Sequence, residues 1–148
     1  MSAVEACDVV LGMWQALSRR DWEALKSFLS TDCLYVDMPI PAVAARGPDD
    51  IVKRLNALDQ LAGYQHHDGL LVSNGSDIIY EHSETWIFPS GEQGTLKFVT
   101  VHRVVNGKVT VWKDYWDMAT LMSFAPTGYF ESFAAGDTSW IFDATGLV

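Results

Sequence analysis

The segment LKFVTVHRVVNGKVTVWKDYW, residues 96–116, has the pattern of two antiparallel strands joined by a tight turn. Apolar and polar residues alternate on both sides of Asn106-Gly107, a dipeptide typical of the two-residue turns of β-hairpins. The alternation predicts one strand over residues 96–105 and a second over 109–116. This hairpin decides the fold class, because its strands need a sheet around them and a packed layer against one face.

The second strand of the hairpin places a carboxylate on a face that is expected to be buried. Trp112, Asp114 and Trp116 point to one side, since side chains alternate in direction along a strand. Two tryptophans on one face indicate burial, and burying an unpaired carboxylate costs several kcal/mol. Asp114 therefore either bonds to backbone at a strand edge or belongs to a functional site.

Further strands precede the hairpin. Residues 64–72 and 78–88 have strand patterns and are separated by the turn sequence SNGSD, and a short early strand is expected over 34–38. Apolar residues recur at helical spacing on both sides of this strand-rich region. The predicted helices span residues 4–18, 22–29, 48–58 and 118–124.

Helices followed by an antiparallel four-strand meander, with one early strand, predict an α+β fold. We expect a cone-shaped, curved and mostly antiparallel sheet with the N-terminal helices packed on its concave face, and a small-molecule cavity between them. The 148 residues are expected to form a single domain, residues 1–148. Residues 125–148 form a C-terminal extension that is aromatic enough to pack on its own domain or on a partner chain.

Composition argues against several classes of partner and site. The formal net charge is -9 and no cluster of Lys and Arg is present, which argues against nucleic acids and anionic membrane surfaces. No apolar run reaches the length of a membrane-spanning helix, and the N-terminus lacks the pattern of a secretory signal. Cys7 and Cys33 form no CxxC pair, which favours reduced thiols in a cytoplasmic protein. The adjacent His66 and His67 point to opposite faces of a strand, so no metal site and no cofactor is expected.

The same alternation predicts which side chains enter the cavity. His82 and Glu84 share a strand face with large aromatic residues, and Tyr35 and Asp37 lie together on the early strand. The expected catalytic set is therefore Tyr35, Asp37, His82, Glu84 and Asp114. The expected walls of the substrate cavity are Tyr80, Trp86, Phe98, His102, Trp112 and Trp116.

Carboxyl groups that share a buried cavity have pKa values pushed apart, one group kept protonated and one ionised. That arrangement is typical of a general acid and a general base in one site. Simpler interpretations remain open from the residues alone. His82 and Glu84 can form a solvated pair on an exposed face, and Asp37 can serve the turn that follows it. His102 can be a hydrogen-bonded core residue.

Three short motifs resemble the limonene-1,2-epoxide hydrolase family. They are YVDMPIP at 35–41, YEHSET at 80–85 and VWKDYWD at 111–117. The family pattern is Tyr-x-Asn-x-Pro, then Arg-x-Asp, then Trp-Arg-Asp-Tyr-Phe-Asp. The resemblance covers roughly residues 4–124. It implies the cone-shaped fold shared with nuclear transport factor 2, ketosteroid isomerase and the small SnoaL-like polyketide cyclases.

What the resemblance implies is a one-step, metal-free hydrolysis without a covalent intermediate. Asp114 matches the general base, which takes a proton from a water that Tyr35 and Asp37 also hold. Glu84 stands at the position of the general acid, which protonates the epoxide oxygen. His82 stands where the family has an arginine that bridges the two carboxylates.

Three of these positions depart from the family pattern. His82 stands in place of an arginine, Glu84 of an aspartate and Asp37 of an asparagine. A histidine titrates near neutrality and reaches less far than an arginine, and an aspartate donates a hydrogen bond only when protonated. The set remains able to do acid–base chemistry, while the reaction itself can differ.

The residues are therefore compatible with three functions. The first is hydrolysis of an apolar, terpenoid-like epoxide. The second is a ketosteroid isomerase-like or polyketide cyclase-like proton transfer next to a carbonyl, which the substitutions at residues 82 and 84 favour slightly. The third is a non-catalytic ligand-binding module, against which the inward-facing carboxylates count.

The expected partners are a small apolar substrate and a second copy of the chain, with no nucleic acid and no membrane. The family commonly dimerises through the outer face of its sheet, so a homodimer is expected here. The apolar residues expected on that face are Val99, Val101, Val109 and Val111.

Overall fold

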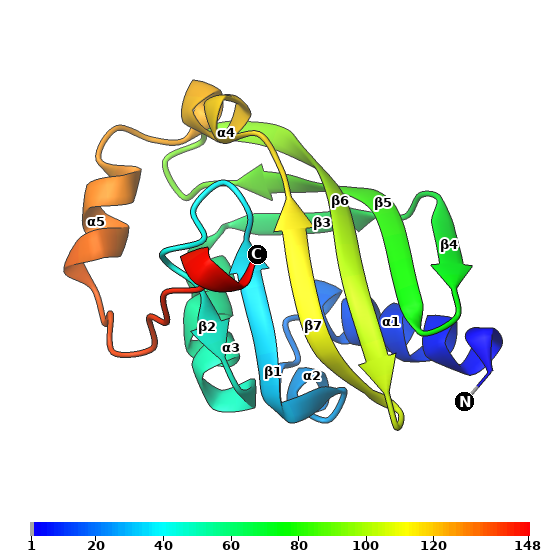
Figure 1. Cartoon of the computed structure of the whole chain (residues 1–148). Coiled ribbons are helices and arrows are strands. Elements are labelled where there is room, and N and C mark those ends of the chain that lie inside the picture. The colour runs from blue at the N-terminus through cyan, green and yellow to red at the C-terminus, as the bar shows by residue number, and fades with distance from the viewer. Residues whose placement is uncertain (1) are drawn as a thin grey trace.

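The computed structural model describes residues 2–148, which form a curved sheet wrapped over N-terminal helices (Figure 1). The first helix, α1, spans Ala3–Ser18 and begins at a capping box. The Ser2 hydroxyl accepts from the Glu5 backbone, and the Glu5 carboxylate accepts from the Ser2 backbone. Of the apolar positions predicted to line its buried face, Val10, Trp14 and Leu17 are buried, whereas Val4 at the start of the helix is 70% exposed.

The sheet has seven strands in the order β2-β1-β7-β6-β5-β3, and β4 pairs with another part of β5. All pairs are antiparallel except β1 with β7, which is parallel. The strands are β1 Leu29–Asp37, β2 Ala45–Arg46, β3 Gly63–His67, β4 Leu71–Asn74, β5 Asp77–Ile87, β6 Gln93–Val105 and β7 Lys108–Tyr115.

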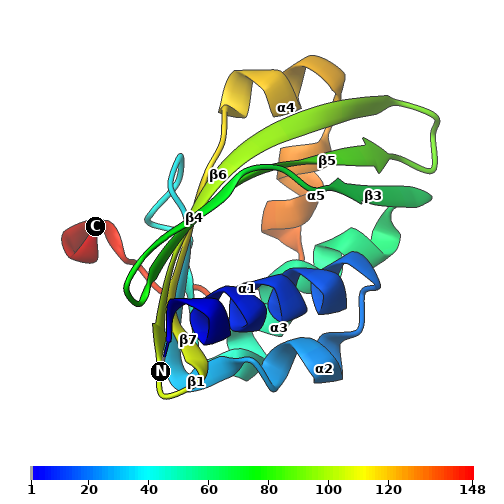
Figure 2. The same cartoon turned by 90° about the vertical axis from the view of Figure 1, so that its right-hand side faces the viewer.

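Helices α1, α2 and α3 lie on the concave side of this sheet and α4 lies at its open end, whereas the short C-terminal helix η2 lies on the outer side (Figure 2). Pro48 begins α3 directly after Gly47, whose φ of 83° suits a glycine, and Asp49 and Asp50 favour the first helical turn electrostatically. Besides α1, the helical segments are α2 Trp22–Lys26, α3 Pro48–Leu55, η1 Asn56–Gln60, α4 Met118–Phe124, α5 Tyr129–Ala135 and η2 Thr145–Leu147.

The predicted α+β architecture is confirmed, and several element boundaries differ. The strand predicted over 64–72 is two strands, β3 and β4, which pair with successive parts of β5. Residues 68–70 form a bulge opposite Glu81 and His82, and at Gly69 an added Cβ would lie 2.0 Å from the Glu81 carbonyl oxygen. The second helix ends at Lys26, the early strand already begins at Leu29, and α5 was not predicted.

The outer face of the sheet differs from expectation at Val109, which is fully buried on the concave side. The β6–β7 register shifts between Arg103 and Val104, because two residues of β7 stand opposite one of β6. This bulge turns Val109 inward while Val111 stays half-buried. Val99 is exposed on the outer face as expected.

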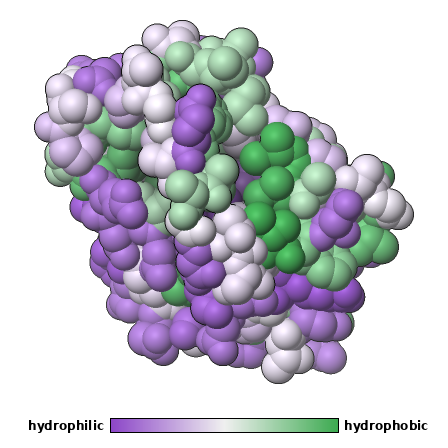
Figure 3. All heavy atoms as spheres, turned by 90° about the vertical axis from the view of Figure 1, so that its left-hand side faces the viewer, coloured by the Kyte–Doolittle hydropathy of each residue, from purple (hydrophilic) through white to green (hydrophobic). Residues whose placement is uncertain are grey.

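The C-terminal extension packs on its own domain, one of the two expected possibilities. Ala44 and Phe142 exchange two backbone hydrogen bonds of 2.8 and 2.9 Å, and Trp140 is buried. The Arg46 guanidinium lies over the Phe142 ring, 5.1 Å from its centroid. Figure 3 shows this side of the molecule, where apolar patches lie among polar ones. Across residues 2–148, no helix has the length and apolarity needed to cross a membrane.

Candidate active site

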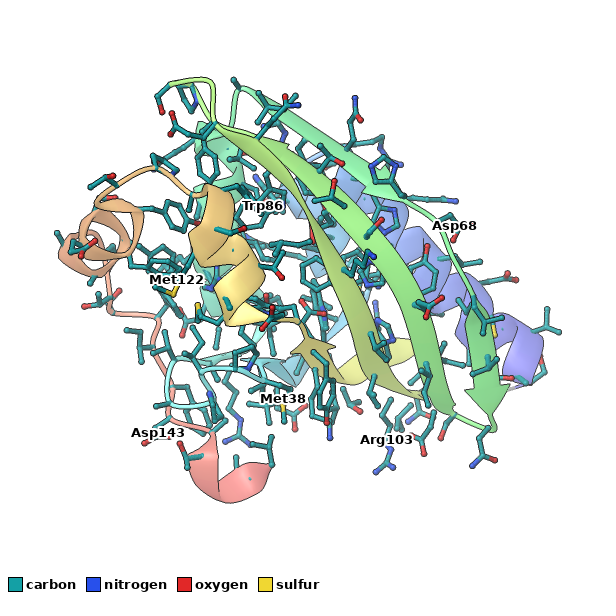
Figure 4. All side chains as sticks on the ribbon, turned by 90° about the horizontal axis from the view of Figure 1, so that it is seen from above. Met38, Asp68, Trp86, Arg103, Met122 and Asp143 are labelled. Carbon is teal, nitrogen blue, oxygen red and sulfur yellow. The ribbon has the colours of Figure 1, made fainter. Side chains whose placement is uncertain are left out.

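A small cavity with a volume of about 70 Å³ lies between the concave face of the sheet and the helices, and it opens to solvent. Of the predicted residues, seven line it: Tyr35, Asp37, Glu84, Trp86, Phe98, Asp114 and Trp116. Figure 4 shows Trp86 directed into the interior, whereas Arg103 projects away from the sheet. Four of the five residues predicted to be catalytic from the strand alternation therefore line one cavity.

Asp114 lies on β7 and is held by donors on both carboxylate oxygens. Thr100 Oγ1 donates to Oδ1 over 2.8 Å, and Trp112 Nε1 donates to the same oxygen over 2.9 Å. The Tyr35 hydroxyl lies 3.3 Å from Oδ2. Burial, and then the nearby charge of Asp37, raise the pKa of Asp114 to about 7, while the three donors oppose this rise. Trp112 is therefore a hydrogen-bond donor that lies behind the cavity wall. This hydrogen bond explains why a carboxylate is buried beside a tryptophan.

Asp37 stands next to Asp114, since the two residues are register partners on the parallel strands β1 and β7. Its Oδ1 accepts from the Tyr35 hydroxyl and from Trp116 Nε1, each over 3.0 Å. Its Oδ2 is 2.9 Å from the Arg54 guanidinium of α3. The extra carboxylate at the family's asparagine position is thus paired with a buried cation.

Glu84 lies on β5 and is as deeply buried as Asp114, but it has fewer hydrogen-bond donors. Burial raises its pKa to about 8, with Asp114 and Asp37 adding to the rise and nearby Tyr64 and Trp86 opposing it. Within residues 2–148, Glu84 Oε2, the Tyr64 hydroxyl and Trp86 Nε1 are each buried without a hydrogen-bond partner of normal geometry. Asp114 accepts two hydrogen bonds at Oδ1 and shares the Tyr35 proton with Asp37 at Oδ2, so a single negative charge shared by Asp114 and Glu84 is better stabilised on Asp114.

His82 does not bridge the two carboxylates, contrary to what the family resemblance implies. Its hydrogen bonds go to Thr100 Oγ1 over 2.8 Å and to His66 Nε2 over 3.1 Å. The imidazole is stacked against the Tyr80 and Phe98 rings, and this stacking holds it behind the cavity wall. Burial, and then the neighbouring histidines, lower the pKa of His82 to about 3.

Tyr80, His102 and Trp112 are also buried behind the cavity wall rather than in it. His102 Nε2 accepts from Trp14 Nε1 over 2.9 Å, and its Nδ1 lies 3.1 Å from the Ile78 carbonyl. Burial lowers its pKa to about 4. His102 is therefore a hydrogen-bonded core residue, the simpler of its two interpretations.

A known protein family matches most of this chain. The model of the limonene-1,2-epoxide hydrolase catalytic domain matches residues 4–126. The chain belongs to the limonene-1,2-epoxide hydrolase family. This confirms the resemblance that the three motifs suggested, over nearly the same residues.

Solved structures agree with the family fold. A limonene-1,2-epoxide hydrolase-like epoxide hydrolase from M. tuberculosis superposes with a TM-score of 0.71 at 20% identity, over 90% of this chain and 95% of that one. A proposed polyketide cyclase from Xanthomonas campestris gives 0.75 at 18% identity, over 82% and 97%. TerC co-crystallised with polyporic acid gives 0.71 at 20% identity, over 81% and 97%. At these identities the structures show a shared fold.

The residues that follow the family's catalytic domain close the cavity of this member. Tyr129, Phe130 and Phe133 of the extension line it, together with Trp14 from α1. Phe133 also covers Arg54, whose guanidinium lies 4.9 Å from the ring centroid. These aromatic residues are dispersed beyond the last predicted helix, so no strand or helix pattern marks them as cavity residues.

Arg54 and Tyr64 were missed for different reasons. Arg54 falls in a helix with charged residues on several sides, where an arginine is expected to face solvent. Tyr64 lies on β3, before the bulge at Gly69, and is the register partner of Trp86, a pairing that only the sheet topology reveals. Among residues 2–148, no group of three or more His, Cys, Asp or Glu side chains is arranged to hold a metal ion.

Proposed function

We propose that this protein adds water to the ring of a small, mainly apolar epoxide in one step. The observation that carries the proposal is the difference between Asp114 and Glu84, two carboxyl groups of one cavity. Asp114 Oδ1 accepts two hydrogen bonds and its Oδ2 shares the Tyr35 proton with Asp37, while Glu84 Oε2 accepts none within residues 2–148. One group is suited to be ionised and the other to be protonated, as a general base and a general acid must be.

Asp114 is the proposed base. Its Oδ1 is occupied by Thr100 and Trp112, so Oδ2 is the oxygen that can take a proton from water. The Tyr35 hydroxyl lies between Oδ2 of Asp114 and Oδ1 of Asp37, and its single proton can go to only one of them at a time. A water bound here meets one donor and two carboxylates, which fixes its orientation toward the substrate.

Glu84 is the proposed acid. The water oxygen forms a bond to a ring carbon as the carbon–oxygen bond of the epoxide breaks. Glu84 gives its proton to the released oxygen, and Asp114 receives the proton from the water. Exchange with solvent then returns a proton to Glu84 and removes one from Asp114, so that atoms and charges balance over the cycle.

The aromatic walls support an apolar substrate. Trp86, Phe98 and Trp116 from the sheet face Tyr129 and Phe133 of the extension across the cavity. Such walls bind hydrocarbon surface and exclude bulk water, which strengthens the electrostatic contrast between the two carboxyl groups.

The test is product analysis with a panel of cyclic and terpenoid epoxides. Diol formation that falls by about 100-fold or more in Asp114→Asn and in Glu84→Gln is expected, since general acid–base groups contribute on this scale. Glu81→Gln and Asp117→Asn are the matched controls. Glu81 is an exposed residue of β5, the strand that carries Glu84, and Asp117 is the exposed N-cap residue of α4. Both variants should keep full activity. Equal diol formation in all four variants would refute the assignment.

Proton transfer next to a carbonyl is the second candidate. The position of His82 favours it, because the bridge between carboxylates that the family resemblance implies is not made here. Asp37 or Asp114 would be the base, and protonated Glu84 would donate to the enolate oxygen. Exchange of a substrate C–H for deuterium without diol formation would select this function.

We also propose a cytoplasmic homodimer that associates through the outer face of the sheet. Ile79, Val99 and Tyr115 are each more than 40% exposed there, and Val72 of β4 extends the patch. Cys7 and Cys33 are both free thiols, which fits a reducing compartment. Gel filtration at monomer mass would contradict the dimer, and Val99→Glu should convert a dimer to a monomer.

A further inference from the structure

A chain of hydrogen bonds crosses the sheet from Asp114 to an edge strand. Thr100 Oγ1 lies 2.8 Å from Asp114 Oδ1, His82 Nε2 lies 2.8 Å from Thr100 Oγ1, and His66 Nε2 lies 3.1 Å from His82 Nδ1. The four residues stand on β7, β6, β5 and β3, which are neighbours in that order. Thr100 and His82 are buried, while His66 is half-buried at the sheet edge.

The chemistry of the two ends gives this chain a direction. An ionised Asp114 can only accept, so Thr100 donates its hydroxyl proton to it. The Thr100 oxygen then accepts from Nε2–H of His82. A neutral imidazole carries one N–H, so His82 Nδ1 accepts from Nε2–H of His66. Every proton in the chain points toward Asp114.

Aromatic packing fixes the rings that make these contacts. Trp14 stacks on His66 with centroids 5.4 Å apart and an interplanar angle of 11°, and lies 4.3 Å from the His82 ring. Tyr80 and Phe98 hold His82 at centroid distances of 4.6 and 5.2 Å. The titratable groups that face the chain are His67 and Asp68 at His66, Tyr80 and His102 at His82, and Tyr35, Asp37 and Glu84 at Asp114.

We propose that His66, His82 and Thr100 are positioning residues that act in series on Asp114. The chain directs donors to Oδ1, which stabilises the charged form of Asp114 and leaves Oδ2 facing the cavity. It gives His82 a role of its own, different from that of the bridging arginine implied by the family. That Asp114 is a base rests on the proposed function, whereas the direction of the chain does not.

The first test needs no substrate. ¹⁵N NMR of the histidine side chains should show His82 neutral from pH 5 to 8, as the tautomer with a proton on Nε2 and a bare Nδ1. His66 should carry its proton on Nε2 in the same spectra. A proton on His82 Nδ1, or a charged His82 in this range, would overturn the proposal, whatever the enzyme's reaction proves to be.

The second test titrates the Asp114 carboxyl directly by ¹³C NMR in three variants. Thr100→Val keeps the shape of the side chain and removes the donor, so the pKa of Asp114 should rise by about one pH unit. Thr100→Ser keeps a hydroxyl and should restore the wild-type titration. Thr95→Val is the matched control on the exposed face of β6, and should leave it unchanged. An unchanged titration in Thr100→Val would overturn the proposal.

If Thr100→Val does not fold, a variant at the His66 end of the hydrogen-bond chain provides the test. His66→Phe keeps a ring against Trp14 but cannot donate to His82. The His82 Nδ1 signal should then move toward that of an imidazole nitrogen without a donor, and the Nε2 tautomer should lose population. A His82 spectrum identical to that of the wild type would show that the chain does not extend to His66.

Discussion

The guanidinium of Arg54 lies 2.9 Å from Oδ2 of Asp37, and this buried ion pair joins α3 to the first strand. Asp37 is 2% exposed, so its charge has almost no access to water. The family's asparagine position therefore carries a second carboxylate here, together with the cation that compensates it. Phe133 of the extension covers the other side of the guanidinium.

Removing Arg54 should destabilise the protein more than removing the whole pair. Arg54→Met leaves Asp37 buried and unpaired and should lower the free energy of unfolding by about 3–5 kcal/mol. Arg54→Met combined with Asp37→Asn removes both charges and should recover most of that loss. Urea unfolding measures both values. If the double variant is no more stable than Arg54→Met alone, the unpaired charge of Asp37 does not account for the stability lost in Arg54→Met.

The pH dependence of the rate should follow the two carboxyl groups. Activity should rise as Asp114 ionises near pH 7 and fall as Glu84 loses its proton near pH 8, which gives a narrow maximum between them. Asp37→Asn removes a negative charge that raises the pKa of Asp114, so the acidic limb should move to lower pH. The profile of kcat/KM measures both limbs. An acidic limb that moves to higher pH in this variant would contradict the electrostatic assignment.

Glu84 should also make the stability of the folded protein depend on pH. Its pKa is about 8 in the folded state and 4.5 when free, so the folded state binds more protons between these values. The free energy of unfolding therefore falls as pH rises through this window. Glu84→Gln removes this dependence. The free energy of unfolding of the variant, minus that of the wild type, should therefore increase by about 4 kcal/mol between pH 5 and pH 9.

Parallel urea titrations of the two proteins at both pH values provide that comparison. His82 and His102 are unchanged between them, so the acid destabilisation expected as pH falls below 6.5 cancels in the difference. A difference in stability that does not change with pH would mean that Glu84 is ionised in the folded protein throughout this range.

The C-terminal extension should affect substrate binding more than chemistry. Phe133→Ala removes one cavity wall and should raise KM by about tenfold with a smaller change in kcat. Phe142→Ala is the matched control, because this ring packs against Arg46 and a small cluster with Val36 and Ala44, outside the cavity lining. Equal effects of the two variants on KM would show that the extension acts only through stability.

Strand alternation predicted the face of the sheet to which each site residue points, but not how far each side chain lies from the cavity. Tyr35, Asp37, Glu84 and Asp114 all face the cavity, because the period of two is a local property of each strand. His82 shares a face with Glu84 yet lies behind the wall, since the depth at each position depends on how Trp14 of α1 packs over the sheet. That packing joins residues far apart in sequence.

Local irregularities account for the remaining differences. The bulge that turns Val109 inward and the bulge at Gly69 each break a regular alternation at a point that the pattern alone does not mark. Arg54 was missed because a charged helical residue is expected in solvent until its partner is known. The partner, Asp37, lies 17 residues away on β1.

The central claim is that Asp114 activates a water that attacks the epoxide directly. A single turnover in H₂¹⁸O, with enzyme in excess over an epoxide that the panel identifies as a substrate, tests it most directly. The account predicts one ¹⁸O atom in the diol of that first turnover and no label in any carboxylate of the protein. An unlabelled diol, with ¹⁸O appearing in Asp114, Asp37 or Glu84 on peptide mass analysis, would show an ester intermediate and contradict the account.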